Sequence, residues 1–492
     1  MLPEATGYKT NISLTVLLRW LNGRPPLPPG PKNLPIVGPL FDLAKRKDDL
    51  RVTYFNWSKV YGDVFHFSIF GHHTIVLNSS KAMFELLDKR SSNYSDRPDM
   101  PMVKDLMEWN WATSLMRYSD WWRIHRRTFH QYFQPRAISD YYPVQRTATA
   151  DLMSNLAESP EHFHEHVRFA SDSAILQIAY GYSLKRKDDP YIGLVERAGS
   201  SVLAAHNHGT FWVDYFPSLK YVPSWLPGAG FRRKAKVWAG YSRDLVESPW
   251  DWLKGSIENR TAPPSFSTRS LERLSVNAGD GSFMEGVIKN CAAFAYLGAA
   301  ETTPAAILTF ILAMVVNPEA QARAQAEIDE AFGLSGLPEL HDRDRLPFVN
   351  AVIAETLRWN PVAPLVVPHR ALNDDIYDRW FIPAGATIVP NVWAVLCDET
   401  VYGPNTKDFD PERFMKQDGK ELPPDPELFV FGFGRRICPG RYFAMDTLFL
   451  VVTHLLATFT LAKPLNDNGE EVSPKVEWVE GSVSCAHSIH SM

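Results

Sequence analysis

A single cysteine near the end of the chain carries the chemistry that the sequence suggests first. Cys438 lies in the run Phe-Gly-Phe-Gly-Arg-Arg-Ile-Cys-Pro-Gly at 431–440, just before a helical apolar stretch at about 442–459. The positive end of a helix dipole favours the thiolate form of such a cysteine, and Arg435 and Arg436 add positive charge beside it. Thiolate is the form that binds iron, so Cys438 is a candidate metal ligand.

Two glycines shape the loop around this cysteine. Gly434 and Gly440 would let the backbone turn sharply and approach a flat ligand closely. A small buried apolar residue is the common alternative for a lone cysteine, and a nucleophilic cysteine with a distant histidine stays open. A structural zinc site needs about four ligands, whereas Cys291, Cys397 and Cys485 are isolated in the sequence. Ligation of haem by a thiolate is the interpretation that remains.

The same run resembles a known signature. Phe431, Gly434, Arg436, Cys438 and Gly440 fill the pattern F-x-x-G-x-R-x-C-x-G, which is similar to the haem-binding motif of the cytochrome P-450 monooxygenases. The resemblance implies haem b with Cys438 as its axial thiolate ligand. It also implies a mainly α fold, a large helical domain with a small β-sheet subdomain, in which the haem lies between a central helix and the helix after the cysteine loop.

A long apolar run supplies the candidate central helix. Residues 291–316 are apolar enough to be mistaken for a membrane span, but Glu301 beside Thr302 would be costly in lipid, so a buried helix is the better account. Pro304 has no N–H, which leaves the carbonyl of Ala300 free and bends the helix. A free carbonyl beside a carboxylate and a hydroxyl makes a polar notch.

This notch resembles the family's oxygen-activation motif, with Ala299 where glycine is usual. The resemblance implies that Glu301 and Thr302 relay protons during oxygen activation, a role that a positioned acid and hydroxyl can serve. The alternative is a threonine hydroxyl bonded back to its own helix. Beside Cys438, we prefer the proton relay.

Two arginines and a glutamate form a second motif. Glu355 and Arg358 lie three residues apart on a predicted helix at 349–359, which by itself would be an ordinary surface pair. They also match the family's E-x-x-R, and Arg413 matches the arginine that joins that pair. The implied role of Glu355, Arg358 and Arg413 is structural, since together they would fix the backbone behind the cysteine loop.

Further residues resemble partners of the two haem propionates. Trp122 and Arg126 lie four apart on one helix face and fit the family's W-x-x-x-R. His369 and Arg436 look like additional partners, because buried carboxylates need cationic or donor groups. A basic helix on the surface is the alternative for Arg126.

The substrate region is the least informative part of the sequence, because aromatic clusters are more often core than site. In the family, the corresponding regions line the pocket. They imply an apolar, bulky substrate, such as a terpenoid, polyketide or indole-type metabolite of fungal secondary metabolism. The candidate pocket residues are Trp109, Met116, Phe211, Ala299 and Val366.

The resemblance also implies partners and a reaction. We expect a monomer that takes two electrons from an NADPH-cytochrome P-450 reductase, with cytochrome b5 as a further donor, and inserts one oxygen atom into a lipophilic substrate. Surface arginines would attract an acidic redox partner. The alternatives are a haem-thiolate isomerase, dehydratase or peroxygenase, or a truncated haem-binding protein without turnover. The surface arginines are Arg123, Arg127, Arg435 and Arg441.

Composition and organisation agree with this picture. A net charge of −5 and 22% charged residues give no basic tract for nucleic acid, and four scattered cysteines argue for a reducing compartment. Residues 1–24 hold no full membrane anchor, since only 12–18 are apolar against the roughly 20 residues that a span requires. A proline-rich hinge follows at 25–39, and the catalytic domain occupies 40–492. We expect the cytosolic face of the endoplasmic reticulum by resemblance, with a cytoplasmic or peripheral location as the alternative because no transmembrane helix is predicted.

A small sheet should accompany the helices. Runs at 64–70, 74–76 and 387–391 are rich in β-branched and aromatic residues, which is typical of strands.

Overall fold

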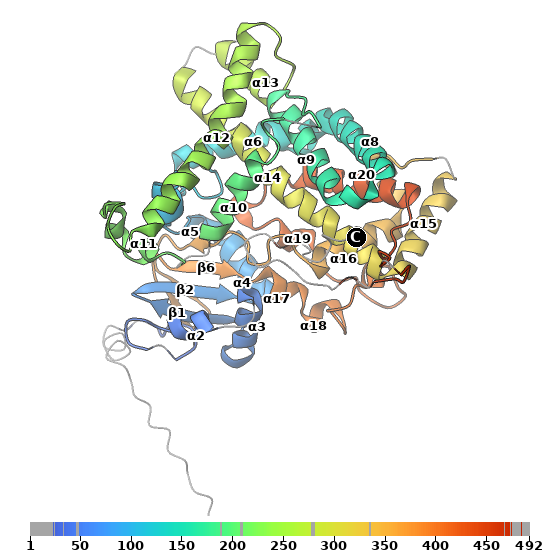
Figure 1. The fold of residues 1–492 in the computed structure, drawn as a ribbon. Coiled ribbons are helices and arrows are strands. Elements are labelled where there is room, and N and C mark those ends of the chain that lie inside the picture. The colour runs from blue at the N-terminus through green and yellow to red at the C-terminus, as the bar shows by residue number, and fades with distance from the viewer. Residues whose placement is uncertain are drawn as a thin grey trace, which may run out of the picture.

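The fold is mainly helical, with a small sheet on one side (Figure 1). A computed structural model describes residues 23, 25–32, 34–45, 49–186, 189–206, 210–276, 281–333, 336–466, 468–472, 474 and 484. The N-terminal segment predicted at 1–24 therefore lies outside the described residues, apart from Gly23. The longer helices are α3 (Leu50–Tyr61), α6 (Asp120–Phe133), α8 (Tyr142–Glu158), α9 (Phe163–Tyr180), α10 (Leu194–His206), α12 (Gly230–Glu258), α13 (Phe266–Val276), α14 (Gly281–Val316), α15 (Pro318–Phe332), α16 (Pro347–Trp359) and α20 (Arg441–Thr458).

Helix α14 is the central element that the apolar run predicted, and it begins ten residues earlier than that run. It packs against α9, α6 and α20 and contains Pro304 within its length. Within the described part of the chain it is the one helix that is long and apolar enough to cross a membrane, yet 72% of its most apolar window is buried inside the protein. Protein side chains rather than lipid cover it, as expected for a core helix.

The sheet confirms the three predicted strands. Strand β1 (Val64–Ile69) pairs antiparallel with β2 (His72–Leu77), β2 runs parallel to β6 (Thr387–Pro390), and the two-residue strand β3 (His369–Arg370) completes the order β1-β2-β6-β3. A separate hairpin joins β4 (Asp375–Tyr377) to β5 (Trp380–Ile382). The sheet thus brings residues near 70 and 388 together, although they are far apart in the sequence.

The proline-rich segment is hydrogen-bonded to the sheet and to the β4–β5 hairpin. The backbone N–H of His66 donates to the Pro29 carbonyl at 2.8 Å, and that of Phe381 donates to the Pro26 carbonyl at 2.7 Å. Gly30 lies so close to β1 that a Cβ there would stand 1.7 Å from the His66 carbonyl oxygen. This part of the predicted hinge is therefore fixed along the sheet, while the domain boundary at 39/40 stays a prediction.

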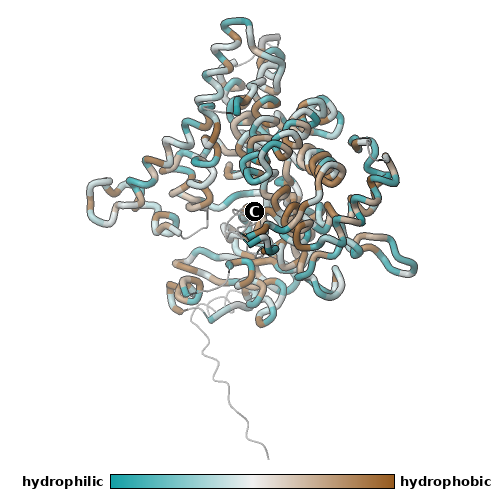
Figure 2. The backbone as a smooth tube through the Cα atoms, turned by 45° about the vertical axis from the view of Figure 1, so that its right-hand side comes forward, coloured by the Kyte–Doolittle hydropathy of each residue, from teal (hydrophilic) through white to brown (hydrophobic). Residues whose placement is uncertain are grey.

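The helical part holds two large hydrophobic clusters, and α14 contributes to both. The first half of α14, from Val287 to Ala300, packs with residues of α6, α9 and α12. The second half, from Ile307 to Val315, packs with α15, α16 and α20. Figure 2 shows the hydrophobic stretches gathered in the interior and the hydrophilic ones on the outer helices and loops.

Candidate functional site

Cys438 lies in a short loop between η8 (Gly434–Arg436) and the start of α20. Its N–H donates to the Phe431 carbonyl at 2.7 Å, which closes the loop. Burial raises the pKa of the Cys438 thiol, while the Gly440 N–H and the charges of Arg126 and Arg441 act in the opposite direction. The groups that favour the thiolate are therefore present, but burial outweighs them in the protein alone.

This result corrects two expectations about the loop cations. Arg435 and Arg436 do not act on the sulfur as predicted: Arg435 is exposed and donates to the Tyr118 hydroxyl, whereas Arg436 Nε donates to the Ser95 carbonyl at 2.7 Å. The predicted preference for the thiolate is also wrong for the protein alone, because burial raises the pKa of the Cys438 thiol. A bound metal would reverse this, because a coordinating thiol loses its proton outright.

The two loop glycines serve different purposes. Gly434 has φ +51°, and a Cβ there would stand 2.3 Å from the Leu87 carbonyl oxygen of the short helix η1 (Phe84–Lys89). Among the described residues its close approach is to a neighbouring backbone, and the approach to a flat ligand stays a prediction. Gly440 has an ordinary φ of −91°. A Cβ at Gly440 would lie 4.0 Å from the Cys438 sulfur.

Buried cations collect near the cysteine loop. Arg97 Nη1 donates to the Val367 carbonyl at 2.6 Å, and Arg436 Nη2 donates to the Met116 carbonyl at 2.8 Å. Burial lowers the pKa of both arginines, that of Arg436 to about 9, and the charge of Arg436 further lowers the pKa of Arg97. Neither makes an ion pair with a described carboxylate within 4 Å. Buried positive charge that mainly carbonyls compensate fits a ligand with two carboxylates, as haem has.

His369 adds a nitrogen with no partner. Its Nδ1 lies 2.7 Å from the Tyr94 carbonyl and must donate, because a carbonyl only accepts. Its Nε2 is buried and has no hydrogen-bond partner among the described residues. Burial and the charge of Arg97 lower the pKa of His369, so the ring is neutral and Nε2 carries a lone pair. A carboxylate at this point would favour protonation of Nε2 and accept a hydrogen bond from it.

Helix α6 places Trp122 and Arg126 beside the same loop. Arg126 Nη1 donates to the Ile437 carbonyl at 2.6 Å, directly before Cys438. The guanidinium of Arg436 lies 4.2 Å from the centre of the Trp122 ring. The structure thus brings Trp122, Arg126, Arg436 and the cysteine loop together, which a solvated surface helix would not do.

The two predicted relay residues on α14 differ in their hydrogen bonding. Thr302 Oγ1 donates to the Gly298 carbonyl at 2.6 Å, which is the back-bonded arrangement weighed as the alternative. Glu301 Oε1 is buried and has no hydrogen-bond partner among the described residues. Burial raises the pKa of Glu301 to about 7, although Arg168 lowers it. The proton relay stays a prediction.

Glu355 and Arg358 form a fully buried pair, so the surface-pair alternative is wrong. Arg358 Nε donates to Glu355 Oε2 at 2.6 Å and Arg358 Nη2 donates to Oε1 at 2.7 Å, with both side chains 0% exposed. Arg358 Nη1 also donates to the Leu396 and Thr406 carbonyls. Arg413 Nε lies 3.6 Å from Glu355 Oε1. The three residues therefore meet as the motif resemblance implied.

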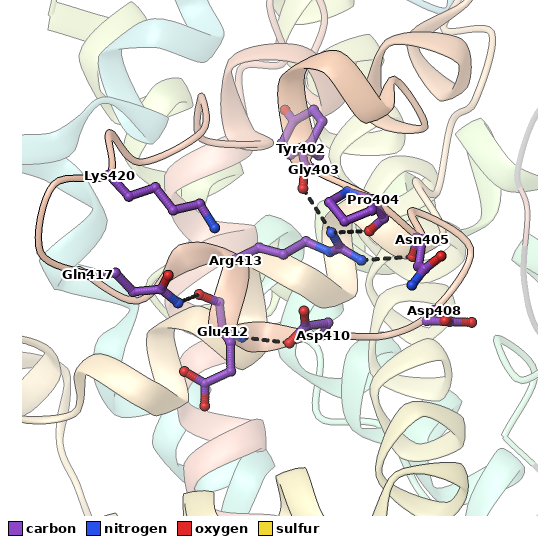
Figure 3. Close-up of a pocket in the computed structure, with 10 residues that line it drawn as sticks. All are labelled: Tyr402, Gly403, Pro404, Asn405, Asp408, Asp410, Glu412, Arg413, Gln417 and Lys420. Atoms are coloured by element: carbon purple, nitrogen blue, oxygen red, sulfur yellow. Dashed lines mark hydrogen bonds between the residues drawn. The ribbon is translucent and has the colours of Figure 1, made fainter.

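Arg413 extends this network into the loop after α18 (Glu399–Tyr402). Its two terminal nitrogens donate to the carbonyls of Tyr402, Pro404 and Asn405 at 2.7–2.8 Å (Figure 3). A polar hollow of about 390 Å³ opens beside this guanidinium. Because the terminal nitrogens of Arg413 donate to loop carbonyls, its contacts are those of a structural residue.

The predicted substrate residues are only partly brought together. Trp109 is buried and stacks on Trp111, with ring centroids 5.2 Å apart, and Phe211 and Ala299 pack against the same hydrophobic cluster. Met116 lies outside this cluster, and its carbonyl accepts from Arg436. Val366 packs instead with the cluster at the sheet and has φ +51°, a strained conformation for a β-branched residue.

Sequence reasoning missed three buried charged residues. Arg97 stands before Pro98 in an irregular stretch, with no spacing that marks it as part of a motif. Asp172 and Asp214 are both less than 10% exposed, and each has one buried oxygen without a partner among the described residues. The available signal was a lone acid within an apolar helical segment.

Comparison with known proteins identifies close relatives. The family model for cytochrome P-450 matches residues 28–479. A cytochrome P-450 monooxygenase of Armillaria gallica is 40% identical over 93% of this chain and 90% of its own length. The tryptamine 4-monooxygenase of Psilocybe cyanescens is 37% identical over 92% of this chain and 90% of its own length. A zebrafish cytochrome P-450 solved with abiraterone has the same fold, with a TM-score of 0.70 at 23% identity, covering 89% of this chain and 97% of that one.

Proposed function

This chain belongs to the cytochrome P-450 family and is a monooxygenase, and on that basis we propose that it oxidises a lipophilic small molecule of fungal secondary metabolism. Its electrons would come from an NADPH-dependent reductase, with cytochrome b5 as a further donor. The observation that supports this best is Cys438, held by the Phe431 carbonyl and flanked by Arg126 and Arg441. The proposal covers the substrate class, the redox partner and a monomeric state.

The residues of the site fit haem b. Cys438 would supply the axial thiolate, and Arg97, Arg126, Arg436 and His369 would face the two carboxylates. Trp122, Phe431, Gly434 and Gly440 would complete the cradle. When bound, haem supplies the activation of dioxygen with two electrons. The buried cations and the unpartnered His369 Nε2 support this assignment.

The chain's own contribution to the reaction is to move protons and exclude water. Because burial raises the pKa of Glu301 to about 7, this carboxyl can both release and take up a proton near neutral pH. The Thr302 hydroxyl donates to the Gly298 carbonyl, which leaves its oxygen lone pairs free to accept a hydrogen bond. Pro304 provides no N–H for the Ala300 carbonyl, so a second acceptor lies one residue from Glu301.

The substrate is proposed to be a terpenoid, polyketide or indole-type metabolite. Trp109, Phe211 and Ala299 border one apolar cluster, which favours a bulky apolar molecule. A relative named tryptamine 4-monooxygenase, at 37% identity, supports the indole type among the three. Binding of each class can be compared by the change it causes in the haem absorption spectrum.

A surface patch supports peripheral contact with the membrane of the endoplasmic reticulum. Phe70 contacts Trp212 and Phe216 of the α11 region (α11, Trp212–Tyr215), with ring centroids 5.8 and 5.1 Å away. Nearby in the chain, Tyr221 and Trp225 are each 78% exposed. Exposed aromatics with a basic stretch suit an interface with anionic lipid. The basic residues, at the start of α12, are Arg232, Arg233, Lys234 and Lys236.

The central test is the absorption of the reduced protein with carbon monoxide. Wild-type protein should show the red-shifted Soret band that thiolate ligation produces, and Cys438→Ser should lose it. Cys397→Ser is the matched control, because this cysteine is also partly buried but stands outside the loop. A band that persists in Cys438→Ser would contradict the proposal.

A further inference from the structure

An acid outside the recognised motifs lies beside the oxygen-activation segment. Asp172 belongs to α9, which packs side by side with α14 (Figure 1). Asp172 is only 9% exposed, and its Oδ1 is buried without a hydrogen-bond partner among the described residues. Glu301 Oε1 on α14 is likewise buried without a hydrogen-bond partner among the described residues. Two orphaned carboxyl oxygens at one helix interface are costly unless they share a proton or a bridging donor.

The third helix of this region leaves room for Glu301. Gly199 of α10 faces the carboxyl group so closely that a Cβ there would stand 2.8 Å from Glu301 Oε1 and 2.9 Å from its carboxyl carbon. A side chain at this position would therefore displace the acid. Glycine in the middle of a helix lowers its stability, so the space at Gly199 has a structural cost.

A surface ion pair closes the region toward solvent. Arg168 stands four residues before Asp172, so the two share a face of α9. Glu196 stands three residues before Gly199, so these two share a face of α10. Arg168 Nη1 lies 3.7 Å from Glu196 Oε1, and the two side chains are 43% and 59% exposed. The buried acids thus lie behind a pair that water can reach.

The charges around Asp172 agree with a group that holds its proton. Burial raises the pKa of Asp172 to about 8, the charges of Glu301 and Glu196 raise it further, and Arg168 lowers it. Tyr296 of α14 also faces Asp172, and its hydroxyl donates to the Tyr191 carbonyl at 3.1 Å. Burial therefore favours the protonated form of both acids, and of Asp172 more strongly than of Glu301.

We propose that Asp172 is a positioning residue for oxygen activation, which stores a proton for Glu301 and regains it from solvent behind the Arg168–Glu196 pair. In this step the O–H bond of the Asp172 carboxylic acid breaks and its proton passes through a bridging water to the Glu301 carboxylate, since no hydrogen bond joins the two groups directly. Asp172 is left as a carboxylate and takes up a proton from hydronium in the solvent, which becomes water, so no electrons move. The role rests on the proposed function, because it requires Glu301 to take part in turnover.

The test compares Asp172→Asn with Glu158→Gln in the haem-loaded enzyme with its reductase. Asp172→Asn should keep the carbon monoxide band and bind substrate normally, but form about tenfold less product per NADPH at pH 8, with a smaller loss at pH 6. Glu158→Gln, which removes a 74% exposed carboxylate at the end of α8, should stay within about twofold of wild type. Arg168→Gln, a partly exposed change, should move the pH profile upward because it removes the charge that lowers the pKa of both acids.

A second readout needs no turnover. The infrared band of protonated carboxyl groups at pH 7 should be weaker in Asp172→Asn than in wild-type protein by the contribution of one carboxyl group, because Glu301 and Asp214 also contribute to it. An unchanged pH profile together with an unchanged infrared band would overturn the role of Asp172. If wild-type protein lacked the carbon monoxide band, the proposed function itself would fail, which is a different outcome. Should Asp172→Asn not fold, an unmoved profile in Arg168→Gln would still overturn the proposal.

Discussion

At the scale of single residues, the two loop glycines should respond differently to the same substitution. In Gly434→Ala, a methyl group would meet the Leu87 carbonyl at 2.3 Å on a backbone with φ +51°. Left-handed strain and the clash together should lower the free energy of unfolding by about 3 kcal/mol. Denaturant unfolding measures this loss, and the carbon monoxide band shows whether the cysteine loop keeps its shape.

Gly440→Ala provides the comparison for this prediction. Its φ is −91°, and the added Cβ would lie 4.0 Å from the Cys438 sulfur, an ordinary contact. We expect a change below about 1 kcal/mol in unfolding free energy. Equal losses in the two variants would show that the approach to η1 is not what requires glycine at 434.

At the scale of elements, one carboxyl group joins α11 to the short helix η2 (Met102–Leu106). Asp214 Oδ1 accepts from the Met102 N–H at 3.0 Å, and its Oδ2 is buried without a partner among the described residues. Burial raises the pKa of Asp214 to about 7. The folded state therefore binds a proton more tightly than the unfolded chain, so the fold around Asp214 is most stable at low pH and loses stability as the pH rises from about 4 to 7.

Hydrogen exchange can test this contact. Above pH 7, amides of η2 should exchange faster in wild type than in Asp214→Asn at the same pH, because asparagine keeps the acceptor oxygen without a charge. The exposed pair of Asp105 and Lys220, 2.9 Å apart, joins neighbouring segments. Asp105→Asn is thus the control and should change exchange little between pH 5 and 8. Equal protection in wild type and Asp214→Asn at pH 8 would contradict the prediction.

At the scale of the whole molecule, the exposed aromatics near Phe70 should govern attachment to lipid. Trp212 and Trp225 are 56% and 78% exposed and can enter an interface without breaking the core. Replacing either with serine should weaken binding to anionic vesicles about tenfold, since burying a large apolar side chain is worth about 1.5–3 kcal/mol. Co-sedimentation with vesicles of phosphatidylcholine and phosphatidylserine measures this change.

Leu422→Ser is the matched control for lipid attachment. Leu422 is 53% exposed but belongs to the loop after η7 (Pro411–Phe414), away from α11. This variant should bind vesicles as wild type does. If all three variants bound equally well, the patch would not be the attachment surface.

Motif spacing predicted a large part of the molecule. Glu355 and Arg358 were placed together because residues three apart share a helix face, and the strands near 64, 74 and 387 followed from β-branched and aromatic runs. Cys438 was found because its neighbours form a dense local pattern. These features are local in the sequence, so one chain is enough to show them.

The remainder depends on contacts between distant segments. Arg97, Asp172 and Asp214 have no local pattern, and only folding buries them. Folding also leaves one carboxyl oxygen of each acid without a partner among the described residues. The pKa direction of Cys438 was predicted wrongly for the same reason, because burial is a property of the folded chain and not of the adjacent arginines. The requirement at Gly434 came from the Leu87 backbone, more than 300 positions earlier in the sequence.

The 36 residues of α14 make it about 54 Å long, at roughly 1.5 Å per residue. One half of the helix belongs to each hydrophobic cluster, and Pro304 stands between the two halves, so α14 is a single element that two cores share. A substitution that loosens the packing of one cluster should therefore also weaken the packing of the other, because both rest on the same helix. Glu301 and Thr302 lie between the two halves, so a change of packing in either cluster would reach these two predicted relay residues.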